Sequence, residues 1–125
     1  MTWTTARATL DARMSALPSL GTAKIAWPNV TLAPQTNLYY AVAFLPVGVN
    51  PELGGVAHEE GIYQVSVFAP AGQGMGAALT AAQAVSDHFK RYRSGSVSCG
   101  VPTLEAPLQE PNWLQIPVSI PFRIL

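Results

Sequence analysis

The C-terminal segment, residues 113–123, constrains the fold of this chain most. Apolar residues alternate along it with polar residues and prolines, which is the pattern of a β-strand with one buried face. Pro117 and Pro121 share the second face, and both lack the amide hydrogen that a β-ladder requires. We therefore expect the strand edge to which these two nitrogens point to be free or irregularly paired. The predicted buried set is Leu114, Ile116, Val118, Ile120 and Phe122.

Two other segments carry apolar residues at helical spacing. The first spans residues 3–17 and ends before Pro18. The second spans residues 75–92, and Gly95 follows it as a stop signal. Basic residues gather at the end of the second segment, where cations interact favourably with a helix dipole. These are Lys90, Arg91 and Arg93.

Four more segments are predicted to be strands: residues 24–27, 38–45, 61–69 and 97–101. Residues 38–45 are almost continuously apolar, which predicts a central strand covered on both faces. The order is helix, three strands, helix, two strands. It predicts an α+β fold, with a mostly antiparallel sheet of about four to five strands packed against two helices. At 125 residues, we expect residues 1–125 to form one domain.

Residues 47–60 form a connection that is longer than a hairpin turn between two strands requires. Connections of this length usually have a function. Its glycines raise the entropy of the free loop, so ordering it needs contacts from elsewhere. We predict an assembly element that a neighbouring subunit or another partner protein orders. The candidate interface residues are Val47, Val49, Leu53, Val56, His58, Glu59 and Glu60.

The composition favours a protein that assembles with other proteins. Charged residues make up 11% of the chain, against about a quarter in a typical domain, so much of the surface is uncharged. Seven basic and seven acidic residues balance, which predicts no general attraction to nucleic acid or membranes. No apolar stretch is long enough to span a bilayer, and no export signal is visible, so we expect a soluble protein. The single cysteine, Cys99, is expected in the core.

No set of residues predicts catalysis, a bound cofactor or a metal. Gly72, Gly74 and Ala77 fit a relaxed dinucleotide-binding pattern, but no carboxylate stands about twenty positions on, so a tight turn is favoured. His58 lacks a second histidine one helical turn along the chain, and is interpreted as a solvated loop residue. His88 is interpreted as a helix-dipole partner. A small nucleotide-dependent enzyme that uses the glycine turn stays an open alternative.

Three motifs resemble a family of short phage and prophage proteins related to tail terminators. They are residues 27–30 (WPNV), residues 61–70 (GIYQVSVFAP) and residues 115–122 (QIPVSIPF). The resemblance implies a structural virion protein rather than an enzyme. Such a protein forms a ring, by the family's pattern a hexamer, at the head-proximal end of the tail tube, stops tube growth and provides the head-docking surface.

The same resemblance implies which partners the protein has. These are further copies of the chain, the major tail tube protein and a head-tail connector or stopper protein, assembled in the host cytoplasm. Genome DNA would pass through the ring without specific binding, and no membrane is involved. A neck or connector subunit nearer the head is the structural alternative.

Overall fold

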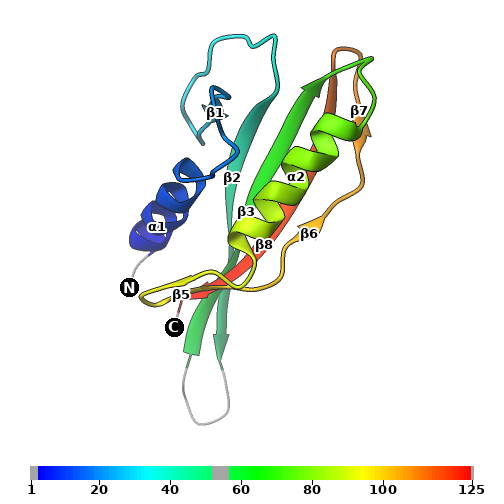
Figure 1. Cartoon of the computed structure of the whole chain (residues 1–125). Coiled ribbons are helices and arrows are strands. Elements are labelled where there is room, and N and C mark those ends of the chain that lie inside the picture. The colour runs from blue at the N-terminus through cyan, green and yellow to red at the C-terminus, as the bar shows by residue number, and fades with distance from the viewer. Residues whose placement is uncertain (1–2, 52–56, 125) are drawn as a thin grey trace.

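The computed structural model describes residues 3–51 and 57–124 of the chain (Figure 1). The described part contains two helices and an eight-stranded sheet, so the α+β class and the mostly antiparallel pairing are confirmed. The strands are more numerous than predicted because residues 93–109 divide into four short ones. In chain order the elements are α1 (Trp3–Ser15), β1 (Ile25–Ala26), β2 (Tyr39–Pro51), β3 (Ala57–Pro70), α2 (Gly76–Phe89), β4 (Arg93–Ser94), β5 (Val97–Cys99), β6 (Thr103–Leu104), β7 (Leu108–Gln109) and β8 (Trp113–Ile124).

The sheet is built around three long strands in the order β2-β3-β8. Strand β3 pairs antiparallel with both neighbours, while β1 pairs parallel with β2 at Tyr40 and Ala41 only. The prediction that residues 38–45 form a central strand covered on both faces is therefore wrong. Strand β2 lies next to the sheet edge, and its apolar run reflects one buried face and one face of small or half-buried side chains.

The second edge of β8 is irregularly paired, as the two prolines predict. The carbonyls of Pro117 and Pro121 accept hydrogen bonds from the amides of Glu105 and Gly100, each at 2.8 Å. The two prolines have no amide hydrogens to return, so no long strand can pair there. Three short strands, β5, β6 and β7, share this edge instead, whereas β3 pairs along the whole opposite edge.

Both helices lie on one face of the sheet, and the core lies between them and the sheet (Figure 1). The predicted apolar set of β8 is buried there. No described helix or strand covers the opposite face, which we call the open face. Its middle carries small and uncharged side chains, among them Ala41, Ala43, Gln64, Ser66 and Ser119.

An aromatic cluster closes one end of the core. The Trp3 ring meets the rings of Phe44 and Phe122 edge-on, with centroid distances of 6.0 and 6.2 Å. The Phe122 ring lies directly over Gly61, where an added Cβ would be 2.6 Å from the ring. Only glycine leaves room for this ring, so the first residue of the 61–70 motif has a packing role.

Gly72 and Gly74 form the turn that leads from β3 into α2. Their φ angles are +85° and +73°, and an added Cβ would meet nothing within 4 Å at either position. Backbone conformation, rather than space, therefore favours glycine at both positions. The turn interpretation of this pattern agrees with the geometry.

We expect Gly72→Ala or Gly74→Ala to lower the free energy of unfolding by about 1 kcal/mol or more, because alanine is strained at positive φ. Denaturant unfolding measures this. Gly76→Ala is the matched control, since Gly76 is helical and unobstructed, and it should leave stability unchanged or raise it. Saturable binding of a nicotinamide or flavin nucleotide that is lost in the first two variants would contradict the turn interpretation.

Candidate functional site

The segment predicted as a long loop is mostly a β-hairpin, so this prediction is wrong. Strands β2 and β3 continue to Pro51 and from Ala57, with pairs from Gly48↔Glu60 to Pro51↔Ala57. Strand β8 stops pairing at Glu59↔Ile124, so the outer part of the hairpin extends beyond the sheet body (Figure 1). Scattered glycines and a proline concealed the strand pattern, because the register shifts between Pro46 and Gly48 and breaks the alternation.

The predicted interface residues are distributed along this hairpin. Val47 lies at the register shift and is 65% exposed, while Glu59 and Glu60 are half-buried on β3. One carboxylate oxygen of Glu59 is buried and has no hydrogen-bond partner among the described residues. Val49 and His58 are placed only by their backbone pairing, with Glu59 and Asn50 respectively. Leu53 and Val56 lie outside the described residues.

A row of polar residues crosses the open face at the base of the hairpin. Cross-strand partners run from Arg93 on β4 through Ser98 and Arg123 to Glu60 on β3. The Arg123 guanidinium lies 4.0 Å from the Glu60 carboxylate, and both side chains are partly exposed. Solvent screens such a pair, so it adds little to stability. The row therefore leaves charged groups at the sheet surface beside the hairpin.

A shallow depression of about 590 Å³ adjoins this row. Its lining includes Val47, Ile62, Gly100 and Pro121, together with the charged residues Glu60 and Arg123. Val101, the residue after Gly100, is 52% exposed. Exposed apolar side chains next to charged groups are typical of a protein-binding surface.

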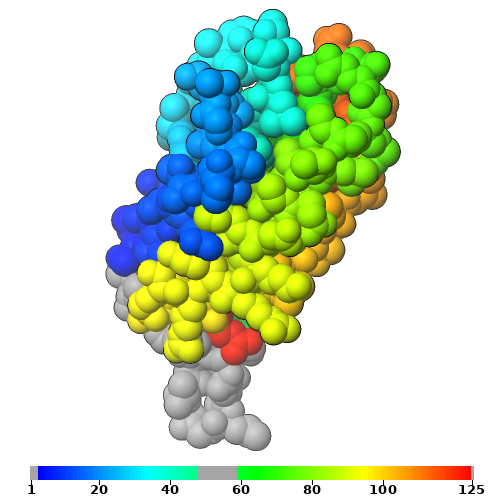
Figure 2. All heavy atoms as spheres, viewed as in Figure 1, coloured from blue at the N-terminus to red at the C-terminus, as the bar shows by residue number. Residues whose placement is uncertain are grey.

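A second hollow, of about 840 Å³, separates the N-terminal half of α2 from the chain around β1. In Figure 2 its walls are the green surface of α2 and the blue and cyan surfaces of the preceding segments. Small side chains of α2 line one wall, including Ala77, Ala81 and Ala84. Lys24 is the charged residue in its lining. The hollow is far from the hairpin base along the sheet.

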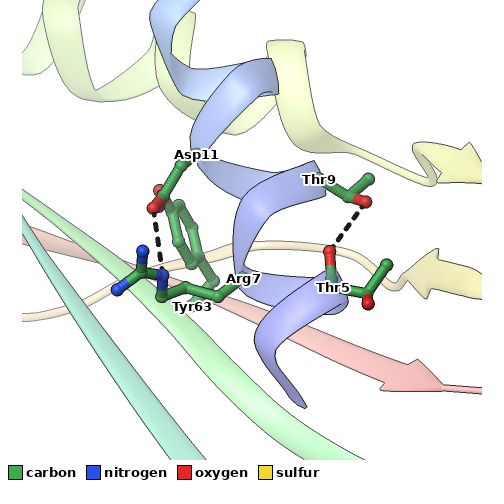
Figure 3. A network of polar contacts seen from close by, with 5 residues as sticks. All are labelled: Thr5, Arg7, Thr9, Asp11 and Tyr63. Atoms are coloured by element: carbon green, nitrogen blue, oxygen red, sulfur yellow. Dashed lines mark hydrogen bonds and ion pairs between the residues drawn. The ribbon is translucent and has the colours of Figure 1, made fainter. Parts of the chain in front are cut away.

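Helix α1 is attached to the sheet by a buried tyrosine (Figure 3). The Tyr63 ring is fully buried, and its hydroxyl donates a 2.6 Å hydrogen bond to Oδ1 of Asp11. Burial, and then the hydrogen bond to Asp11, raise the pKa of Tyr63 far above its usual range, so the phenol keeps its proton. Arg7 Nε lies 3.5 Å from the second Asp11 oxygen. The contact orients α1 over β3.

A reciprocal contact joins the C-terminal ends of the two helices. Arg13 of α1 donates from Nε and Nη2 to the carbonyl of His88 on α2, at 3.1 and 2.7 Å. His88 Nε2 lies 2.8 Å from the carbonyl of Arg13, so this nitrogen carries the proton and donates. Burial chiefly lowers the pKa of His88, which favours the neutral ring. Each side chain thus satisfies a carbonyl in the last turn of the other helix.

Neither inter-element contact is predictable from sequence patterns. The partners are 52 and 75 positions apart, and no local motif marks them. The dipole interpretation of His88 was incomplete, since its ring binds the end of α1 as well as lying near the end of α2. The Arg13 guanidinium also lies 4.2 Å from the centre of the Tyr92 ring, a cation–π contact.

No group of three or more His, Cys, Asp or Glu side chains within the described residues is placed to hold a metal ion. Cys99 is buried, as predicted, and burial raises the pKa of its thiol to about 11, which makes it unreactive. None of the described helices is long and apolar enough to cross a membrane.

A family model and a solved structure match this chain. A family model described as phage tail terminator protein matches residues 5–122, which is nearly the whole chain. One solved structure, whose description gives no function, has a TM-score of 0.78 with 20% sequence identity. The match covers 100% of this chain and 96% of that one. At this identity the likeness shows the fold alone. No curated protein matches the sequence.

Proposed function

Because the chain belongs to the phage tail terminator family, and is thus a structural protein of the phage tail, we propose that it caps the tail tube. As a ring on the head-proximal end of the tube, it stops tube growth and provides the surface to which the head docks. The match over residues 5–122 is the observation that carries this proposal. On this proposal the whole chain acts as one domain.

Surface chemistry supports assembly into a ring. The helices leave the open face of the sheet without a cover in the described part, and several large apolar side chains are exposed. Copies that associate through two different surfaces form a closed ring when the rotation from each copy to the next adds up to one full turn. Six copies would agree with the family resemblance. A net charge of zero supports a lumen through which DNA passes without adhering.

The hairpin formed by β2 and β3 supports contact with a partner along the ring axis. Its outer part is paired to itself, beyond the last pair with β8, and exposes Val47 at its base. We assign this hairpin to the tail tube contact. Its candidate residues remain those of the sequence prediction: Val47, Val49, Leu53, Val56, His58, Glu59 and Glu60.

Phage particles assembled without this protein test the proposal. We expect overlong tails without heads, because tube growth would lack a stop and heads would lack a docking surface. Symmetric reconstruction of wild-type tails should then find a closed ring of this chain at the head-proximal end. Tails of normal length that lack heads would favour a neck connector instead. A single copy at that end would contradict the ring.

A further inference from the structure

The turn after α2 carries a group of cations that the fold itself does not use. Lys90, Arg91 and Arg93 are exposed and form no ion pair with another described residue. Figure 1 places this turn and β4 at the same end of the molecule as the outer parts of β2 and β3. The yellow surface in Figure 2 shows the segment accessible on the helix-bearing side.

Arg91 has a backbone conformation that glycine would adopt more easily. Two described non-glycine residues have positive φ, Asn29 at 59° and Arg91 at 55°. Asparagine tolerates this region through local hydrogen bonds, whereas arginine has no such compensation. Helices commonly end with glycine at this position. Fold stability alone therefore does not account for an arginine here, and strain of this kind is often retained for function.

Backbone hydrogen bonds attach the turn to the neighbouring strand, which fixes the positions from which its cationic side chains leave the backbone. The Arg91 amide donates to the carbonyl of Gly100 at 3.0 Å, and the Cys99 amide donates to the carbonyl of Tyr92 at 2.8 Å. These bonds attach the turn to β5. Through β5, the cross-strand row continues from Arg93 to Arg123 at the base of the hairpin. Arg93 thus connects the basic turn to the row at the base of the hairpin.

We propose that this basic turn docks onto an acidic protein surface at the end of the tail tube. The proposal rests on the proposed function, because the tube is the partner assigned to the adjoining hairpin. Protein fits better than DNA for two reasons. The 590 Å³ depression, whose lining includes exposed Val47, also includes Ser98 and Arg123 of the row that begins at Arg93, and it suits a partner's side chains. DNA fits less well, because the turn offers only a few cations and the chain has a net charge of zero.

The test uses fluorescently labelled full-length protein and tail tubes purified from particles assembled without it. Arg91→Gly should weaken tube binding about threefold, and Arg91→Gly with Arg93→Gln about tenfold, as expected for losing exposed ion pairs. Arg91→Gly should also raise the unfolding midpoint by about 2–4 °C, because it relieves positive φ. Lys24→Gln, which removes one exposed cation near β1, is the matched control and should bind as the wild type does.

Each outcome of the binding experiment tests a different part of the argument. If the wild type binds tubes and the double variant binds equally well, the basic turn is not the docking surface. If the wild type itself does not bind tubes, the proposed function fails. If tube binding is unchanged but the variants lose binding to a double-stranded DNA fragment, the turn contacts DNA and the proposal is overturned. Wild-type binding that weakens with NaCl more steeply than double-variant binding supports the proposal.

Discussion

Shortening the β2–β3 hairpin should abolish tail capping while the domain keeps its stability. The variant replaces residues 50–58 with Asn-Gly, so that Val49 and Glu59, which are cross-strand partners, flank a two-residue turn. The removed residues lie beyond the last pair between β3 and β8, so the sheet body loses no partner. We expect overlong or headless tails by electron microscopy, together with an unfolding midpoint close to that of the wild type.

A point variant separates the loss of the exposed apolar surface from the shortening of the hairpin. Val47→Asp places a charge on the exposed apolar side chain at the hairpin base and should also impair capping. Val30→Asp is the matched control, since Val30 is 62% exposed in the loop between β1 and β2, toward the opposite end of the molecule (Figure 1). Normal capping by the stable shortened protein would refute the assignment of the hairpin to the tube contact.

Tyr63→Phe should give a large loss of stability for the removal of one atom. The hydroxyl is fully buried and donates at 2.6 Å to Asp11, so its loss leaves a partly buried carboxylate oxygen without its donor. Unsatisfied groups of this kind lower the free energy of unfolding by about 1–3 kcal/mol. Arg7 cannot replace the lost hydroxyl donor, because its exposed side chain lies 3.5 Å from the other carboxylate oxygen of Asp11.

Urea unfolding of Tyr63→Phe and of a matched control, Tyr39→Phe, measures this loss of unfolding free energy. Tyr39→Phe makes the same chemical change at a half-buried ring whose hydroxyl has no hydrogen bond to a described residue, and should change stability little. Adding Asp11→Ala to each tyrosine variant gives a double-mutant cycle for the Tyr63–Asp11 contact. Equal losses in Tyr63→Phe and Tyr39→Phe would show that the contact to α1 contributes nothing specific.

The elements with uninterrupted periodicity were predicted well. Strand β8 and both helices appear where the apolar spacing places them, and the prolines of β8 correctly predict one irregular edge. The predicted end of the second helix is wrong, because α2 ends at Phe89 and Gly95 lies in the turn after β4. The hairpin was missed because a register shift and glycines hide strand alternation. The position of β2 was misjudged because small apolar residues on an uncovered face resemble those of a strand buried on both sides.

Local chemistry in the sequence determined the secondary structure, the α+β class and the turn at Gly72, because each depends on neighbouring residues and backbone sterics. Only the tertiary structure decided which residues meet across the fold. Tyr63 reaches Asp11, Arg13 and His88 join the two helix ends, and Arg93 begins the row that reaches the hairpin. Such contacts depend on strand order and helix placement, which packing of the whole chain selects and no local pattern encodes.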